Sequence, residues 1–192
     1  MQAFKIQLKV YADAPAGIRL EAFVPVFHRF IKEQRLDETL IDVADYSHVH
    51  HGPGILLEGH GSDYYADLGE GRLGLLYSRK RDAPVDPAAR LPDAFRRAFT
   101  ACALLEAETG LGAPLRFRTD ELLLRVVDRL RAPNTAEAAA ALEPELRTFL
   151  KRLFDGGDVS LVHEGTPKDP LTLRIRAPGA GSVGALVERL KA

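Results

Sequence analysis

Apolar and polar residues alternate at the start of the chain, from Phe4 to Val10. This period of two is typical of a β-strand that buries one of its faces. Residues 20–35 instead repeat their apolar positions at the spacing of an α-helix, which predicts an amphipathic helix. Because proline is tolerated only in the first turn of a helix, Pro25 predicts that the regular part of this helix begins there.

Glycine-rich turns divide the next part of the chain into short strands and one helix. Gly52-Pro53-Gly54 and Gly69-Glu70-Gly71 are the strongest turn signals, and the second predicts a hairpin. The predicted elements are strands at 39–49, 55–57, 62–67 and 72–79, a helix from Pro92 to Gly110, and a short strand at 115–118.

The second half of the chain continues this mixture of strands and helices. Residues 121–128 are predicted to form a strand, although their periodicity alone also allows a helix. Asn134, with Glu137 three residues later, resembles a capping box that starts the next helix. Strands at 158–163 and 171–176 and a final helix at 183–190 complete the prediction.

The order strand, helix, strand, strand, helix therefore occurs twice, which indicates an internal duplication. Leu8 and its neighbours correspond to Leu124 and its neighbours at an offset of 116 residues. The unusual helix proline also matches, because Pro25 corresponds to Pro144 at an offset of 119. The alternative is a chance similarity between two amphipathic patterns.

A β-α-β-β-α-β unit is the ferredoxin-like pattern, and residues 1–118 supply it if 115–118 form its last strand. Residues 119–192 supply the same unit without that strand. We therefore predict an α+β protein of tandem ferredoxin-like halves (βαββα repeated), with antiparallel sheets and helices on one face. Small regulatory modules of the ACT type resemble this outline, but the resemblance is one of fold and implies no function.

Composition and charge place the chain among ordinary soluble proteins. Of its 192 residues, 46% are hydrophobic and 28% are charged, and the formal net charge is -1. Such a balance produces no field that would attract nucleic acid or an anionic membrane, and no apolar run approaches the roughly 20 residues of a membrane-spanning helix. A single cysteine, Cys102, excludes an internal disulfide and is expected in the core. We expect a cytoplasmic protein.

Residues 59–81 have no counterpart in the second half, so they are predicted to be an inserted hairpin. This segment is rich in aromatic and ionisable residues, and insertions on a rigid scaffold often bind ligands. The candidate ligand-binding residues are His60, Asp63, Tyr64, Tyr65, Tyr77, Arg79 and Arg81. The alternative is a purely structural hairpin that extends the sheet or covers its edge, with Tyr64 and Tyr65 on opposite faces.

Four of the six histidines lie close together in the sequence, at positions 48, 50, 51 and 60. In an extended strand His48 and His50 point to the same side, and a hairpin through Gly52-Pro53-Gly54 brings His60 near them. Three such ligands suit zinc, iron or a similar divalent ion. The alternative is a set of solvated turn histidines, since no spacing such as His-Glu-x-x-His is present.

Two functional hypotheses follow. The first is a non-enzymatic binding or regulatory protein for a small molecule or a protein, without a cofactor and without nucleic acid, and homodimeric because open sheets leave edges that a second copy covers. The second is a small metal-dependent enzyme that uses His48, His50 and His60 with a divalent transition metal.

Overall fold

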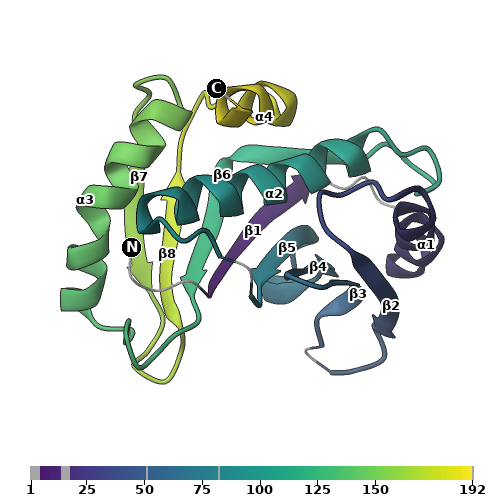
Figure 1. Cartoon of the computed structure of the whole chain (residues 1–192), viewed down its shortest axis with the longest axis horizontal. Helices are drawn as coiled ribbons and strands as arrows, with labels where there is room; N and C mark the ends of the chain where they lie inside the picture. The colour runs from purple at the N-terminus through teal and green to yellow at the C-terminus, as the bar shows by residue number, and fades with distance from the viewer. Residues whose placement is uncertain (1–4, 14–17, 51, 82, 192) are drawn as a thin grey trace.

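The computed structural model describes residues 5–13, 18–50, 52–81 and 83–191 (Figure 1). In this part of the chain, eight strands form one antiparallel sheet in the order β2-β3-β4-β5-β1-β6-β8-β7. Four α-helices accompany the sheet. The predicted mixed α+β class and the antiparallel pairing are confirmed.

The elements follow one another along the chain with short connections. The strands are β1 (Ile6–Asp13), β2 (Leu40–Tyr46), β3 (Gly54–Gly59), β4 (Ser62–Asp67), β5 (Gly74–Arg79), β6 (Arg116–Val126), β7 (Ser160–Glu164) and β8 (Leu171–Arg176). The helices are α1 (Phe23–Glu33), α2 (Arg90–Glu106), α3 (Ala136–Leu153) and α4 (Val183–Lys191). Short 3-10 turns are η1 (Leu20–Ala22), η2 (Gly69–Gly71) and η3 (Pro87–Ala89). Phe4, the predicted start of the first strand, lies outside the described residues.

One hydrophobic core joins all four helices to one face of the sheet. Alternate residues of the central strands, such as Leu8 of β1 and Leu124 of β6, are fully buried in it. Helix α2 crosses the middle of this face in Figure 1, and Phe95 of α2 packs edge-on against Phe149 of α3 with 4.9 Å between ring centroids. The opposite face of the sheet is therefore left for the polar residues of the same strands.

Both helix starts that the sequence predicts are shifted by local chemistry. α1 begins at Phe23, so Pro25 lies in its first turn, where a missing N–H costs no hydrogen bond. The cap of α3 is Thr135, whose Oγ1 accepts a 3.3 Å bond from the Ala138 amide. The prediction that Asn134 caps this helix is wrong, because its side chain is bonded to the turn between β7 and β8 instead.

The strands predicted at 115–118 and 121–128 are one continuous strand, β6. No glycine or proline separates them, so the strand continues through Thr119 and Asp120, with a shift in its register against β1 between Val10 and Ala12, and the predicted boundary at 118–119 falls inside this strand. β6 pairs with β1 along one side and with β8 along the other. The two parts of the chain therefore meet at β6 within a single sheet.

The hairpin predicted at 59–81 is present as β4 and β5, joined by η2. It lies in the interior of the sheet, since β4 pairs with β3 and β5 pairs with β1. β5 alone connects β1 to the meander of β2, β3 and β4. The hairpin is thus a structural part of the sheet and does not cover its edge.

Candidate functional site

Three of the predicted ligand-binding residues, Tyr64, Tyr77 and Arg79, are buried on the helix face of the sheet. The Tyr64 and Tyr77 rings meet edge-on at 5.5 Å, and Ser62 Oγ donates a 3.0 Å hydrogen bond to Tyr77 Oη. Arg79 donates to Asp93 of α2 at 2.5 Å. These side chains hold β4, β5 and α2 together and present no surface to a ligand.

Glu38, just before β2, gives the buried tyrosines their polar partner. Its carboxylate accepts hydrogen bonds from the amides of Gly61 and Ser62, both at 2.9 Å, and from Tyr64 Oη at 2.7 Å. Arg97 of α2 completes the set with a 3.3 Å ion pair. Burial, followed by the Glu38 charge, raises the pKa of Tyr64 far above its ordinary value, so this phenol stays protonated.

The remaining predicted ligand-binding residues are divided between the other face and the turns. Asp63 and Tyr65 lie on the face opposite the helices, where Lys80 forms an ion pair with Asp63 at 2.8 Å. His60 is exposed in the turn between β3 and β4, and Arg81 is exposed after β5. The structure does not bring these seven residues into one site.

The histidines also lie apart. His48 and His50 follow β2, whereas His60 follows β3, so they lie at opposite ends of the β2–β3 hairpin. The His60 amide donates to Thr39 O, at the start of β2, which fixes that end. His51 lies outside the described residues. Among the residues that are described, no group of three His, Cys, Asp or Glu side chains is arranged to hold a metal ion.

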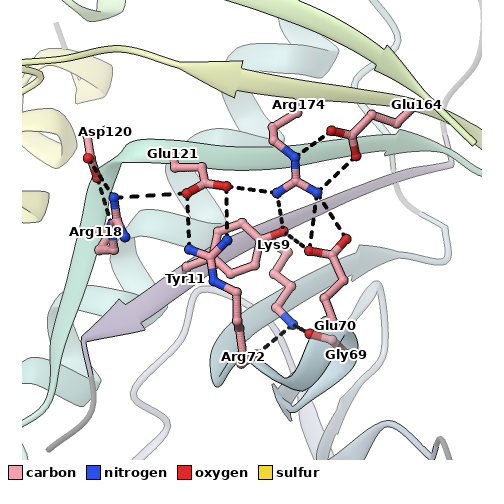
Figure 2. Close-up of polar contacts among 10 residues, drawn as sticks. All are labelled: Lys9, Tyr11, Gly69, Glu70, Arg72, Arg118, Asp120, Glu121, Glu164 and Arg174. Carbon is pink, nitrogen blue, oxygen red and sulfur yellow. Dashed lines mark hydrogen bonds and ion pairs between the residues drawn. The ribbon is translucent and has the colours of Figure 1, made fainter.

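A second polar cluster lies on the face opposite the helices and centres on Lys9 of β1 (Figure 2). Lys9 is only 1% exposed, between Leu76 and Leu123 on the neighbouring strands. Its Nζ pairs with Asp67 and donates to Gly69 O at 2.6 Å and Arg72 O at 2.9 Å. A buried ammonium needs such partners, and here they fasten the β4–β5 turn onto the sheet.

Tyr11 and Arg174 fasten the same turn from its other side, as Figure 2 shows. Tyr11 Oη donates to Glu70 Oε2 at 2.7 Å and accepts from Arg174 Nη1 at 2.8 Å. Arg174 of β8 also binds Glu70, Glu121 and Glu164 at 2.6–3.1 Å. Glu70 is held in the left-handed region, with φ at 63°, and these bonds offset the strain of that conformation.

Arg72 completes the polar network by joining the turn to β6. Its guanidinium lies over the Tyr11 ring, 3.8 Å from the centroid, and forms two hydrogen bonds with Glu121 at 2.9 and 3.1 Å. One connected network of charges therefore joins side chains from β1, β4, β6, β7, β8 and the η2 turn. We call it the polar-face network. Its members are Lys9, Tyr11, Asp67, Glu70, Arg72, Arg118, Asp120, Glu121, Glu164 and Arg174.

The ionisation of the network follows from these contacts. Burial, reinforced by the bond to Glu70, raises the pKa of Tyr11 to about 12. Hydrogen bonds from Arg72 lower the pKa of Glu121. Burial tends to raise the pKa of Glu70, but the bonds from Tyr11 and Arg174 outweigh it and lower that pKa. At neutral pH the carboxylates are charged and the phenol is not, which suits a permanent structural network.

A hollow of about 1040 Å³ opens beside this network. The turn after β2 (47–50 and 52–54) forms one wall and the β4–β5 turn (67–71) forms another, with Leu20 and Arg125 completing the lining. A close backbone approach shapes it, since Gly54 has a φ of 76° and a side chain there would collide with Ala66 O at 2.1 Å. The rigid β4–β5 turn makes this hollow the candidate functional site.

Sequence reasoning singled out His48 and His50 of this lining but missed Arg125 and Glu70. Arg125 stands within a run of apolar residues, Leu122 to Val126, and nothing in that run shows that its side chain lines a hollow. Lys9 gave no signal either, because nothing in the sequence shows that the turn 67–72 folds back over it. The glycines flanking Glu70 marked a turn but not its direction.

Comparisons with other proteins add no family. The chain matches no protein-family model, and no curated protein matches it significantly. Within the described residues, no helix combines the length and the apolar character that crossing a membrane requires.

Proposed function

We propose that this protein binds a small molecule in the hollow between the β2–β3 and β4–β5 turns and acts as a binding or regulatory protein. The observation that carries this proposal is a hollow of about 1040 Å³ with one wall fixed in advance by Lys9. Ligand sites usually enclose about 300–1,000 Å³ and are largely pre-formed. A wall that is already ordered lowers the entropic cost of binding.

The ionisable groups of the wall favour binding over acid–base chemistry. Asp67 is paired with Lys9, and both oxygens of Glu70 are engaged by Arg174, with Tyr11 on one of them. A general acid or base must exchange its proton readily with substrate, whereas the bonds from Tyr11 and Arg174 lower the pKa of Glu70 and the oxygen Oδ2 of Asp67 is engaged by Lys9. They are therefore suited to shaping the site.

Ligand screening by two-dimensional NMR tests the proposal. Bound fragments should shift the amide resonances of residues 47–50, 52, 54 and 67–71. Leu68→Trp, at a 45% exposed lining position, should fill part of the hollow and weaken binding at least tenfold. Leu130→Trp, at a 92% exposed position outside the hollow, is the matched control and should bind as the wild type does. Binding that maps elsewhere, or that survives Leu68→Trp unchanged, would contradict the proposal.

We also propose that the two βαββα halves are a tandem ferredoxin-like duplication. Register supports it: Leu8 and Leu124, the positions matched at an offset of 116, are direct partners in the β1–β6 pair. A two-fold axis through the Leu8–Leu124 pair also exchanges the two flanking pairs, because it places the Ile6–Val126 pair onto the Val10–Leu122 pair. From the centre of the sheet outward, the second half has the strand order β6-β8-β7 and the first half has the order β1-β5-β4-β3-β2. The first half therefore has the same arrangement with two extra strands. Sequences of relatives test this proposal, since their two halves should align with each other at the same offset.

A homodimer remains a proposal, and the β7 edge supports it better than the β2 edge. On β2, the Asp42 carboxylate accepts the Val43 amide at 2.7 Å and the register shifts between Leu40 and Asp42, which disturbs that edge for pairing. On β7, Val162 is 44% exposed. Antiparallel pairing of two β7 strands centred on Val162 sets Ser160 opposite Glu164, so no like charges face each other.

Light scattering coupled to size exclusion tests this arrangement. We expect a dimer for the wild type and a monomer for Val162→Lys, because two lysines would face each other across the axis. Ile41→Lys, at a 52% exposed position on β2, is the control and should remain dimeric. A wild-type monomer at all concentrations would rule out the dimer, and dissociation by Ile41→Lys would assign it to the wrong edge.

A further inference from the structure

Arg125 differs from the other partly buried arginines on the polar face of the sheet. Arg72, Arg118 and Arg174 each bind at least one carboxylate. No residue in the described part of the chain forms a hydrogen bond or an ion pair with the Arg125 guanidinium, although Arg125 is half-buried and lines the hollow. A partly buried guanidinium offers five N–H donors in a planar fork, which suits an oxyanion.

The carboxylates around Arg125 are already engaged. Asp67 binds Lys9 and accepts the Gly69 amide at 3.1 Å. Glu70 binds Tyr11 and Arg174. Asp169, in the β7–β8 turn, accepts the Thr166 amide at 2.7 Å and the Thr166 hydroxyl at 2.8 Å. Asp169 interacts with Arg125 only through its charge, and no carboxylate of the described residues bonds to the Arg125 guanidinium, so its N–H donors can bind the oxygens of a ligand.

The field of Arg125 reaches into the wall of the hollow. Burial is the main reason why the pKa of Lys9 is lowered, and the positive charge of Arg125 lowers it further. The imidazoles of His48 and His50 lie on the wall formed by the turn after β2, whereas the β4–β5 wall carries Asp67 and Glu70, whose charges are paired with Lys9 and Arg174. An anion in the hollow is therefore attracted chiefly by Arg125.

The rest of the lining is largely apolar or backbone. Leu20, Val49, Pro53 and Leu68 contribute apolar surface to the hollow. Resting on the proposed small-molecule function, we infer that the ligand is a small organic anion whose carboxylate or phosphate is held by Arg125 and whose apolar body packs against Leu20, Val49 and Leu68. Arg125 is thus assigned as the residue that determines charge specificity at this site.

Matched probes test the inference on the full chain. Phenylacetate and phenyl phosphate carry the two anionic groups, phenylacetamide is the neutral isostere, and inorganic phosphate lacks the apolar body. Affinities from NMR titration should rank at least one organic anion at least tenfold above the amide, with inorganic phosphate weaker than phenyl phosphate. Added salt should weaken the binding of the anion more than that of the amide.

Three variants identify the anchor. Arg125→Gln should abolish the tenfold preference for the organic anion over the amide. Arg125→Lys should restore part of that preference, because the charge remains but the planar fork is lost. Arg176→Gln, at an exposed arginine of β8 outside the hollow, should behave as the wild type does. Thermal unfolding of each variant verifies that it folds.

The outcomes separate this inference from the proposed function. Amide binding in the hollow as tight as anion binding, or an anion preference that survives Arg125→Gln, overturns the inference and leaves the small-molecule function standing. The inference is also overturned, and the function left standing, if neutral fragments bind in the hollow while no organic anion binds with a Kd below about 10 mM. If resonances of the hollow respond to no probe and no fragment, both the inference and the function are wrong.

Discussion

Lys9 illustrates how one buried charge organises a turn. Its Nζ has three acceptors from the segment 67–72, and it lies under that segment with almost no exposure. Gly74 leaves the room it needs, because a side chain there would come within 3.0 Å of Lys9 Cε. Lys9 and Tyr11 are polar side chains buried in the fold, so both depend on their hydrogen-bond partners in the network.

Replacing Lys9 by methionine should therefore cost far more than the loss of one hydrogen bond. Lys9→Met leaves the Asp67 carboxylate buried without its counter-charge, which costs about 3–5 kcal/mol of unfolding free energy. The double variant Lys9→Met, Asp67→Asn removes the stranded charge and should recover part of that loss. Urea unfolding measures both. Equal stabilities for the single and double variants would show that Asp67 does not depend on Lys9.

At the scale of elements, Asn134 connects α3 to the β7–β8 turn. Its Nδ2 donates to Glu164 O and Thr166 O, both at 3.0 Å, and its Oδ1 contacts His163 Nε2 at 2.7 Å. Thr135 next to it caps α3 by an ordinary side-chain bond. Two adjacent residues thus hold two different elements.

Alanine substitutions should separate these two tasks. Asn134→Ala removes the partner of the partly buried Glu164 and Thr166 carbonyls and of the buried Thr172 amide, and it should lower the unfolding free energy by about 2 kcal/mol. Thr135→Ala removes one cap and should cost about 1 kcal/mol. Amide exchange localises the effects: the Thr172 amide, which donates to Asn134 Oδ1, should exchange faster only in Asn134→Ala. Faster exchange of that amide in both variants would refute this division.

The sequence predicts elements well where periodicity is clear and poorly where a side chain acts at a distance. The span of β8 at 171–176 and the hairpin around Gly69-Glu70-Gly71 follow from alternation and turn residues. The continuity of β6 was missed because polar Thr119 and Asp120 interrupt its apolar pattern. Burial of Tyr64, Tyr77 and Arg79 depends on Glu38 and Asp93, which alternation along β4 and β5 does not reveal.

At the scale of the whole molecule, the polar-face network joins strands from both halves of the chain. Arg174 of β8 reaches Tyr11 of β1 and Glu70 of the β4–β5 turn, and Arg72 reaches Glu121 of β6. The helix-face core crosses the same boundary between β1 and β6. The candidate site therefore lies on a wall that depends on both halves, which explains why local sequence patterns did not identify it.

This network should make the stability of the molecule depend on pH in the acid range. The pKa of Glu121 is lowered in the folded state, chiefly by hydrogen bonds from Arg72, so its contribution is present above the unfolded pKa of about 4.3. That contribution is lost as the pH falls through the lowered folded pKa. Glu121→Gln should thus cost about 2 kcal/mol at pH 7 and progressively less as the pH falls from about 5 to about 3.

Unfolding by urea at several pH values measures the difference between wild type and Glu121→Gln. Glu188→Gln is the control, because its ion pair with Lys191 is exposed and should be worth at most about 0.5 kcal/mol at any pH. A difference for Glu121→Gln that stays the same at pH 3 and pH 7 would mean that its charge contributes nothing. A difference that narrows in acid would show that the charge of Glu121 stabilises the fold through its bonds to Arg72, which follows the β4–β5 turn, and to Arg174 of β8.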